Sequence, residues 1–216
     1  MAHLIKVLES RPLSSPFNQE HFLVQSQGME RWLCQQLAAH FPVWANYQFL
    51  FPGKFFNDLI QSLDARLTSS AFSRGRLLWV IERILRTTEE ATLTQYLTGS
   101  QSALKRFQLA QSLAHVFDQY QMMRPDWLSA WENDSLVTAH EVERWQQRLW
   151  QDIVAILGNK HRGSVWLEAI DLLDKKPAGF LTQQLPERVS VLGVNAMPPI
   201  FFNFILIQSN HIQMPR

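Results

Sequence analysis

The chain has 216 residues, of which 46% are hydrophobic, and its formal net charge is only +1. This apolar content is sufficient for a buried core and excludes a disordered chain. The charge balance gives no overall attraction to nucleic acid, so any contact with a polyanion must come from local basic groups. Cys34 is the single cysteine, which excludes an internal disulfide and a cysteine-based zinc site and fits a reducing cytoplasm.

The sequence predicts neither a targeting segment nor a membrane span. Residues 1–6 lack the basic stretch and the long apolar run of a signal peptide. The longest apolar stretch, at 198–207, is interrupted by Asn203 and is too short to cross a bilayer. We therefore expect a cytoplasmic protein without membrane contact.

The first part of the chain predicts a strand–turn–helix unit. A short helix is expected over 3–9, and the apolar run His21–Ser26 is typical of a buried parallel strand. Gly28 breaks this run, and an extended stretch at 46–52 and an amphipathic helix from Phe55 follow later. The helix directly after Gly28 has apolar side chains at helical spacing: Met29, Trp32, Leu33, Leu37 and Phe41.

The middle of the chain is predicted to be helical. Ser73 is placed to cap a helix that continues through Leu85, and Leu104–Tyr120 is expected to form a long amphipathic helix. Three further helices are expected: one that opens at Pro125, Val142–Leu157 with Gly158 at its end, and Val165–Leu173.

The last part returns to an α/β pattern. Glu187–Val194 is predicted to be a second buried strand, Pro198 opens an apolar helix, and His211–Met214 could begin another strand. The fold class is therefore a helix-rich α/β fold with a small parallel sheet. Three segments are expected: 1–66 as the first part of an α/β domain, 67–184 as a mainly helical subdomain, and 185–216 as a return to the α/β domain. Both ends fall within a predicted element, which we interpret as a fragment of a longer chain.

No catalytic motif is complete. The turn at 26–30 has one glycine and no lysine, whereas a phosphate-binding loop needs a Gly-rich turn and a lysine, so ATP hydrolysis is not expected. Asp126 and Asp174–Lys176 match the letters of a metal-dependent nuclease motif, but one opens a predicted helix and the other closes one. The seven histidines are scattered, no G-x-S-x-G occurs, and Cys34 is expected to be a structural thiol. We therefore predict no catalytic residue, metal site or cofactor in this chain.

The tryptophans and the local basic groups are the remaining candidates for contact with DNA. Trp32, Trp79, Trp145 and Trp150 are at helical positions shared with core residues, which favours packing. Trp44, Trp127 and Trp166 lie near basic or loop segments and could stack on bases, although packing is favoured for each. Basic side chains stand at predicted loops and helix starts, where they could contact phosphates or simply be solvated: Arg31, Lys105, Arg106, Arg124, Lys160, His161 and Arg162.

Three strings of residues are specific enough to indicate a family. They are LVQSQGMERWL at 23–33, FDQY at 117–120 followed by RPDWL at 124–128, and GVNAMPP at 193–199. Their content, order and spacing resemble the RecC family, the gamma subunits of exodeoxyribonuclease V. The resemblance covers essentially the whole chain.

The resemblance implies a superfamily 1 helicase-like domain, related to P-loop enzymes, that has lost its ATPase motifs and contains an inserted helical subdomain. It implies RecB (helicase and nuclease) and RecD (helicase) as partners, in a bacterial complex that processes double-strand DNA ends during recombinational repair. ATP and Mg²⁺ would bind in those partner subunits. Single-stranded and forked DNA are the implied ligands, because the family splits the duplex and scans the 3′-ended strand for the Chi sequence.

The resemblance also implies which side chains would contact Chi. Five positions match the residue types of the family: Gln25, Asp118, Gln119, Arg124 and Arg162. Five more positions correspond to family contacts but have different side chains: Arg31, Phe51, Asn57, His115 and Val116. Gln27 completes the candidate set. Gln and Arg can hydrogen-bond base edges, Arg can also stack on a base, and an Asp can hold an Arg in place.

Two other functions stay open from the residues alone. The small net charge favours a protein–protein assembly fragment without DNA contact. An active helicase or nuclease is disfavoured by the absent phosphate-binding loop and by the positions of the acids.

Overall fold

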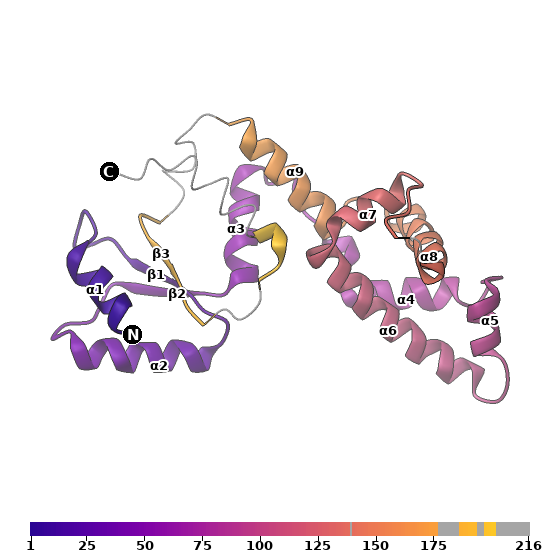
Figure 1. Ribbon diagram of the computed structural model, residues 1–216, viewed down its shortest axis with the longest axis horizontal. Coiled ribbons are helices and arrows are strands. Elements are labelled where there is room, and N and C mark those ends of the chain that lie inside the picture. Colours follow the sequence, from indigo (N-terminus) through magenta and orange to yellow (C-terminus); the bar gives the residue numbers. More distant parts are fainter. Residues whose placement is uncertain (139, 177–185, 194–196, 202–216) are drawn as a thin grey trace. The chain divides into compact units, whose positions relative to one another are not determined.

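The computed structural model describes residues 1–138, 140–176, 186–193 and 197–201, apart from the side chain of residue 70. These residues form two compact units (Figure 1). The sheet unit comprises the described residues of Met1–Asp64 and Lys175–Met197, and the helical unit comprises those of Ala65–Asp174 and Pro198–Asn203. The boundaries expected after residues 66 and 184 stay predictions, and residue 184 lies outside the described residues.

Three parallel strands form the sheet, in the order β2-β1-β3 (Figure 1). They are β1 (Glu20–Leu23), β2 (Tyr47–Leu50) and β3 (Val189–Val191). β2 and β3 lie within stretches that were expected to be extended, and β1 begins one residue before the expected run at His21; all three strands are shorter than expected. The prediction of a helix-rich α/β fold with a small parallel sheet is confirmed. The further strand expected over 211–214 falls outside the described residues.

The sheet unit also contains α1 (Ala2–Ser10), α2 (Gln27–His40) and α3 (Pro52–Leu63). Side chains of α1 and α2 pack against the face of the central strand that Phe22 and Val24 share, since successive side chains of a strand point to opposite faces. The buried members of this core are Leu4, Leu8, Phe22, Val24, Leu33 and Leu37. Arg188 forms an ion pair with Glu20, so a mostly buried charge pair joins the start of β3 to the start of β1.

The helical unit contains six α-helices and one short 3-10 turn among the described residues. They are the turn Ser70–Phe72, α4 (Arg74–Ile84), α5 (Ala91–Leu97), α6 (Ser102–Met123), α7 (Pro125–Glu132), α8 (Glu141–Leu157) and α9 (Arg162–Asp174). Large side chains fill its core, where the rings of Phe117 and Trp150 lie 5.4 Å apart between centroids. As expected, Pro125 opens α7, and Gly158 follows the end of α8 with a positive φ of 81°.

Three details differ from the sequence-based expectations. Ser73 stands at the N-cap of α4, but its side chain makes no capping hydrogen bond. Trp32 and Trp79 are 47% and 64% exposed rather than in the core, because each lies on the outer side of its helix, whereas Leu33 and Leu77 of the same helices are buried. α5 was not predicted, since seven residues show too little periodicity.

Glu143 of α8 holds the loop that leads into this helix. Its carboxylate accepts hydrogen bonds from the indole N–H of Trp131 at 2.8 Å and from the backbone N–H groups of Val137 and Thr138, both at 2.6 Å. Burial raises the pKa of Glu143, but hydrogen bonds from Thr138, Trp131 and the backbone outweigh it and lower the pKa from 4.5 to about 2. The ionised carboxylate therefore stabilises the folded helical unit.

We expect Glu143→Gln to lower the free energy of unfolding by about 3 kcal/mol at pH 7, because one pKa unit corresponds to about 1.4 kcal/mol. A lowered pKa means that this contribution is fully present above about pH 4.5 and is lost as pH falls toward 2. Urea unfolding of both proteins at pH 7 and near pH 3 measures the difference. An unchanged difference at the lower pH would contradict the role of the carboxylate charge.

Candidate functional site

The turn between β1 and α2 presents candidate residues at the carboxyl end of a parallel strand. Gln25 and Gln27 are exposed there, and the exposed Arg31 lies one turn further along α2. Ser26 caps the helix, because its Oγ accepts a hydrogen bond from the backbone N–H of Met29 at 3.2 Å. Ligands of open α/β sheets bind outside the carboxyl ends of the strands, so this turn places both glutamines where a ligand could reach them.

The turn between β2 and α3 leaves the same edge of the sheet. β1 and β2 are parallel, and Leu23 is paired with Leu50, so the residues that follow both strands start side by side. Phe51 comes directly after β2 and is 37% exposed, and Asn57 is exposed on α3. All five candidates of the sheet unit therefore follow the carboxyl ends of β1 and β2.

The other six candidates lie where the end of α6 meets α7 and the start of α9, three helices that contact one another. We call this region the corner. Four candidates are in the last turns of α6, one joins α6 to α7, and one opens α9: His115, Val116, Asp118, Gln119, Arg124 and Arg162. Every candidate of the corner is at least partly exposed. The structure thus gathers the candidates at two places, one in each unit.

Arg162 is held in the corner from both sides. Its guanidinium Nη2 forms an ion pair with the carboxylate of Asp118, and its backbone N–H donates to the side-chain oxygen of the fully buried Gln121 at 3.0 Å. Gly163 follows it, and a Cβ there would meet the Gln121 backbone oxygen and the Pro125 Cβ, each at 2.9 Å. The start of α9 can therefore approach α6 this closely only without a side chain at residue 163.

Arg124 is fixed by a different carboxylate and by an aromatic ring. Its Nε and Nη2 donate to the two carboxylate oxygens of Asp126 at 3.1 and 2.8 Å, and its guanidinium carbon lies 4.1 Å from the centroid of the Trp127 ring. The hydrogen bond from Arg124 lowers the pKa of Asp126. Two-point pairing and stacking together restrict the orientation of a side chain that is only half-exposed.

The two arginines of the corner keep hydrogen-bond donors for a ligand. A guanidinium carries five N–H groups, and the carboxylates of Asp118 and Asp126 use only some of them. The two carboxylates balance the charges of Arg124 and Arg162, so these pairs offer oriented donors rather than excess positive charge. Such an arrangement suits the hydrogen-bond pattern of a base edge better than non-specific attraction to phosphate.

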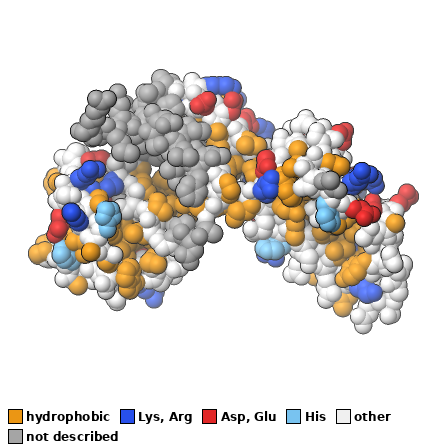
Figure 2. Space-filling view, viewed as in Figure 1, with side chains coloured by type: hydrophobic (Ala, Val, Ile, Leu, Met, Phe, Trp, Pro, Cys, Tyr) orange, Lys and Arg blue, Asp and Glu red, His pale blue; other side chains and the backbone are white. Residues whose placement is uncertain are grey.

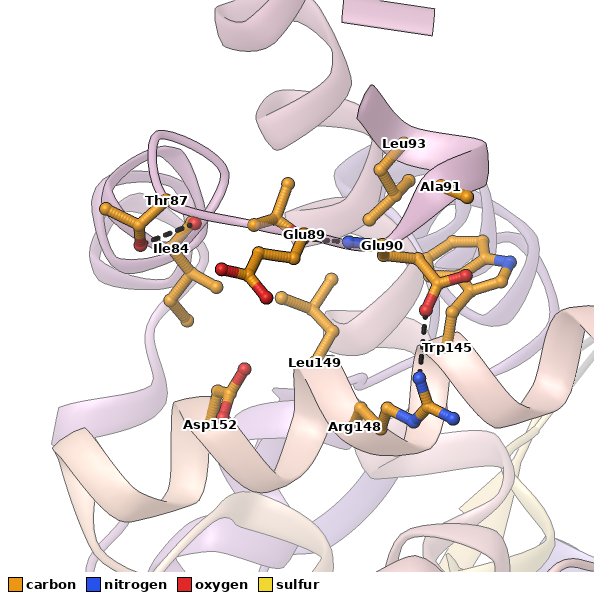
Figure 3. Close-up of a pocket in the computed structure, with 11 residues that line it drawn as sticks. Ile84, Thr87, Glu89, Glu90, Ala91, Leu93, Trp145, Arg148, Leu149 and Asp152 are labelled. Atoms are coloured by element: carbon orange, nitrogen blue, oxygen red, sulfur yellow. Dashed lines mark hydrogen bonds and ion pairs between the residues drawn. The ribbon is translucent and has the colours of Figure 1, made fainter. Parts of the chain in front are cut away.

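A pocket with the opposite charge lies between the end of α4, the start of α5 and α8 (Figure 3). Its volume is about 680 Å³, and three carboxylates line it, those of Glu89, Glu90 and Asp152. Arg148 contributes the one guanidinium of the lining and pairs with Glu90 at 3.1 Å. The excess negative charge would repel phosphate, which disfavours nucleic acid as a ligand of this pocket.

The remaining surface gives no broader basic region on the face that Figure 2 shows, where acidic and basic side chains of the described residues are interspersed. Among the described residues, no three His, Cys, Asp or Glu side chains are grouped so that they could hold a metal ion. In the same part of the chain, no helix has the length and apolarity needed to cross a membrane.

Comparison with known proteins identifies the family. A family model described as "RecC, N-terminal domain" matches residues 1–214. The chain belongs to the RecC family. It is 33% identical over 219 residues to RecBCD enzyme subunit RecC of Escherichia coli (strain K12), which is 96% of this chain and 19% of that protein. It is 28% identical to the RecC subunits of Haemophilus influenzae and Mycolicibacterium smegmatis, with 98% of this chain and 21% and 19% of those proteins covered.

Membership of the RecC family confirms the resemblance that the three strings indicated. The chain spans about a fifth of the length of these relatives, so it corresponds to one segment of a RecC subunit. The names of the relatives place them in the RecBCD enzyme.

Several residues that build the corner were not found from the sequence. Nothing in the local sequence marks Gln121 or Gly163 as structurally important. Their partners lie about forty residues away along the chain, as the 41-residue separation of Gln121 and Arg162 shows. For Trp127 the favoured expectation of packing within the chain is confirmed, since the guanidinium of Arg124 lies over one face of its ring. Trp44 and Trp166 pack against Tyr47 and Phe201 instead of presenting free faces.

We expect Gly163→Ala to destabilise the protein by about 1–3 kcal/mol, because the added methyl group overpacks the contact between α9 and α6. Gly75→Ala is the matched control, since a Cβ at that helical position would meet nothing within 4 Å. Gly75→Ala should leave the free energy of unfolding unchanged or raise it by up to about 1 kcal/mol, because alanine favours a helix more than glycine does. Urea unfolding compares the two variants, and an equal effect would show that residue 163 is not a close contact.

Proposed function

We propose that this RecC-family chain is part of a non-catalytic subunit that handles DNA in an exodeoxyribonuclease V complex. In this proposal it binds the 3′-ended single strand produced at a double-strand break and recognises Chi, in repair by homologous recombination. The observation that carries the proposal is the corner, where Arg124 and Arg162 are each oriented by a carboxylate and keep donors that face solvent. Exposed glutamines at the edge of the sheet supply further donors and acceptors.

The proposed mechanism is recognition by geometry, without any bond made or broken. A single strand presents base edges that are not paired, and Arg and Gln can read their hydrogen-bond patterns. Because Asp118 and Asp126 hold the two guanidiniums, little side-chain entropy is lost when a base binds. A correct sequence would then be bound more tightly than a wrong one, and the complex would respond through a change of conformation.

The fold supports a helicase-like origin for this role. A parallel strand, a tight turn and a helix follow each other at 20–40, which is the arrangement of a phosphate-binding loop. The turn in this chain has Gly28 but lacks the lysine and the further glycines of an active site. We therefore propose an ATPase-dead, superfamily 1 helicase-like domain that needs no cofactor. The ATP and Mg²⁺ of the reaction would bind in the RecB and RecD partners, as their helicase roles require.

An assembly fragment without DNA contact is the second candidate function. The net charge of +1 and the interspersed charges of the visible surface favour it. In that case the corner would be a contact with a partner subunit, and its arginines would bind carboxylates of that partner. The next experiment separates the two functions.

For a full-length RecC subunit that contains these residues, we expect affinity for single-stranded DNA to fall steeply as salt rises. At fixed salt, Arg124→Ala or Arg162→Ala should lower the affinity about tenfold, because each removes oriented donors from the ligand. Arg144→Ala is the matched control, since Arg144 is exposed on α8 and has no ion pair among the described residues. Fluorescence anisotropy measures the binding. Absent or salt-independent binding would favour the assembly function.

In the complete complex, we expect Arg124→Ala and Gln25→Ala to impair the response to Chi and to leave unwinding unchanged. The reason is that both side chains would read bases, whereas unwinding depends on motor activity elsewhere. Products from linear duplexes with and without Chi measure the response, and Gln36→Ala provides a control at another exposed glutamine of the sheet unit. An equal loss of unwinding would instead assign these residues a structural role.

A further inference from the structure

The outward side of α4 presents a tryptophan between two arginines. Arg76, Trp79 and Arg83 are three and four residues apart, which places them on one side of the helix. The opposite side packs into the core through Leu77 and Ile81, which are fully buried. Trp79 is 64% exposed, although burying a tryptophan ordinarily contributes much to stability. A single exposed ring is common on protein surfaces, so a contact surface is indicated only by what lies beside Trp79.

A second aromatic ring extends this surface from the neighbouring helix. α4 and α6 pack side by side in the helical unit (Figure 1). The ring of Phe107 on α6 is 37% exposed, and its centroid lies 6.0 Å from that of Trp79, with an interplanar angle of 54°. We define the α4 face as Arg76, Trp79, Arg83 and Phe107. All four residues belong to the helical unit, so the face is complete without any other part of the chain.

The charge of the α4 face is not neutralised by neighbouring acids. Among the described residues, neither Arg76 nor Arg83 has an ion pair or a hydrogen-bond partner for its side chain. Glu82 is the one acid of α4, and its carboxylate is already engaged by Arg86 at 3.0 Å and by Arg106 at 2.9 Å. The hydrogen bonds from Arg86 and Arg106 lower the pKa of Glu82, so it remains an ion-pair partner for those two arginines. The α4 face therefore combines two rings with uncompensated positive charge.

We propose that the α4 face binds single-stranded DNA, with bases stacked on Trp79 and Phe107 and phosphates bound by Arg76 and Arg83. Stacking on aromatic rings beside cations is the general way in which proteins bind single strands without reading their sequence. A protein partner could also cover exposed rings, but the described residues of this face include no free carboxylate, which favours a polyanion. The α4 face is a second contact surface, and its argument rests on the proposed function only for the identity of the strand as DNA.

The test uses the 216-residue chain and a fluorescently labelled oligothymidylate at low salt. Trp79→Ala and Phe107→Ala should each weaken binding about tenfold, and Trp79→Phe should restore most of the affinity, since a ring remains for stacking. Arg83→Ala should lower the slope of log affinity against log salt by about 0.7, the value for one phosphate contact on a single strand. The controls are Ile156→Ala, another exposed apolar side chain, and Arg144→Ala, both on α8.

The outcomes distinguish this inference from the proposed function. If the chain does not bind the oligonucleotide, or if Trp79→Ala and Phe107→Ala bind like the parent, the α4 face is not a DNA surface. The response to Chi in the complete complex would still decide the role of the corner. If these two variants keep DNA affinity but lose association with the partner subunits, the face is a protein interface and the inference is wrong. Circular dichroism confirms that each variant is folded.

Discussion

The close approach of α9 to the end of α6 is the contact on which the corner depends. Gly163 permits it, and Gln121 stabilises it by accepting the backbone N–H of Arg162 at 3.0 Å. The neighbouring His161 is 1% exposed. Its Nδ1 accepts the backbone N–H of Ser164, so its Nε2 donates to Glu132 at 2.9 Å. A buried hydrogen-bond network thus anchors the helix whose first residue carries a candidate guanidinium.

The helical unit combines three electrostatic environments that the net charge of the chain hides. In the corner, carboxylates pair with Arg124 and Arg162 and leave oriented donors. The pocket beside Arg148 has more carboxylates than cations, and the arginines of the α4 face have no partner in the described part of the chain. A sum of +1 therefore says little about the local potential that a ligand meets, because nearby charges act over about 10 Å at ordinary salt.

The sequence was a good guide to elements with a strong period and a poor guide to contacts between distant residues. Helical spacing in Val142–Leu157 predicted α8 almost residue for residue, and the apolar run after His21 predicted the central strand. The same spacing failed for Trp79, because periodicity identifies a helix but does not fix which large side chains on it are buried. The pairing of Arg162 with Asp118 spans 44 residues and depends on how helices pack, which no local pattern encodes.

The strand order of the sheet has a consequence for how the chain is synthesised. β1 pairs with β2 nearby in sequence, but its other neighbour β3 follows only after the whole helical segment, since Glu20 and Arg188 are 168 residues apart. During translation one side of β1 stays unpaired until β3 has been synthesised, and pairings between strands this distant in sequence form slowly. A helical segment that folds first shortens the effective loop that has to close. The sheet would then be completed late, and only in chains whose helical segment has already folded.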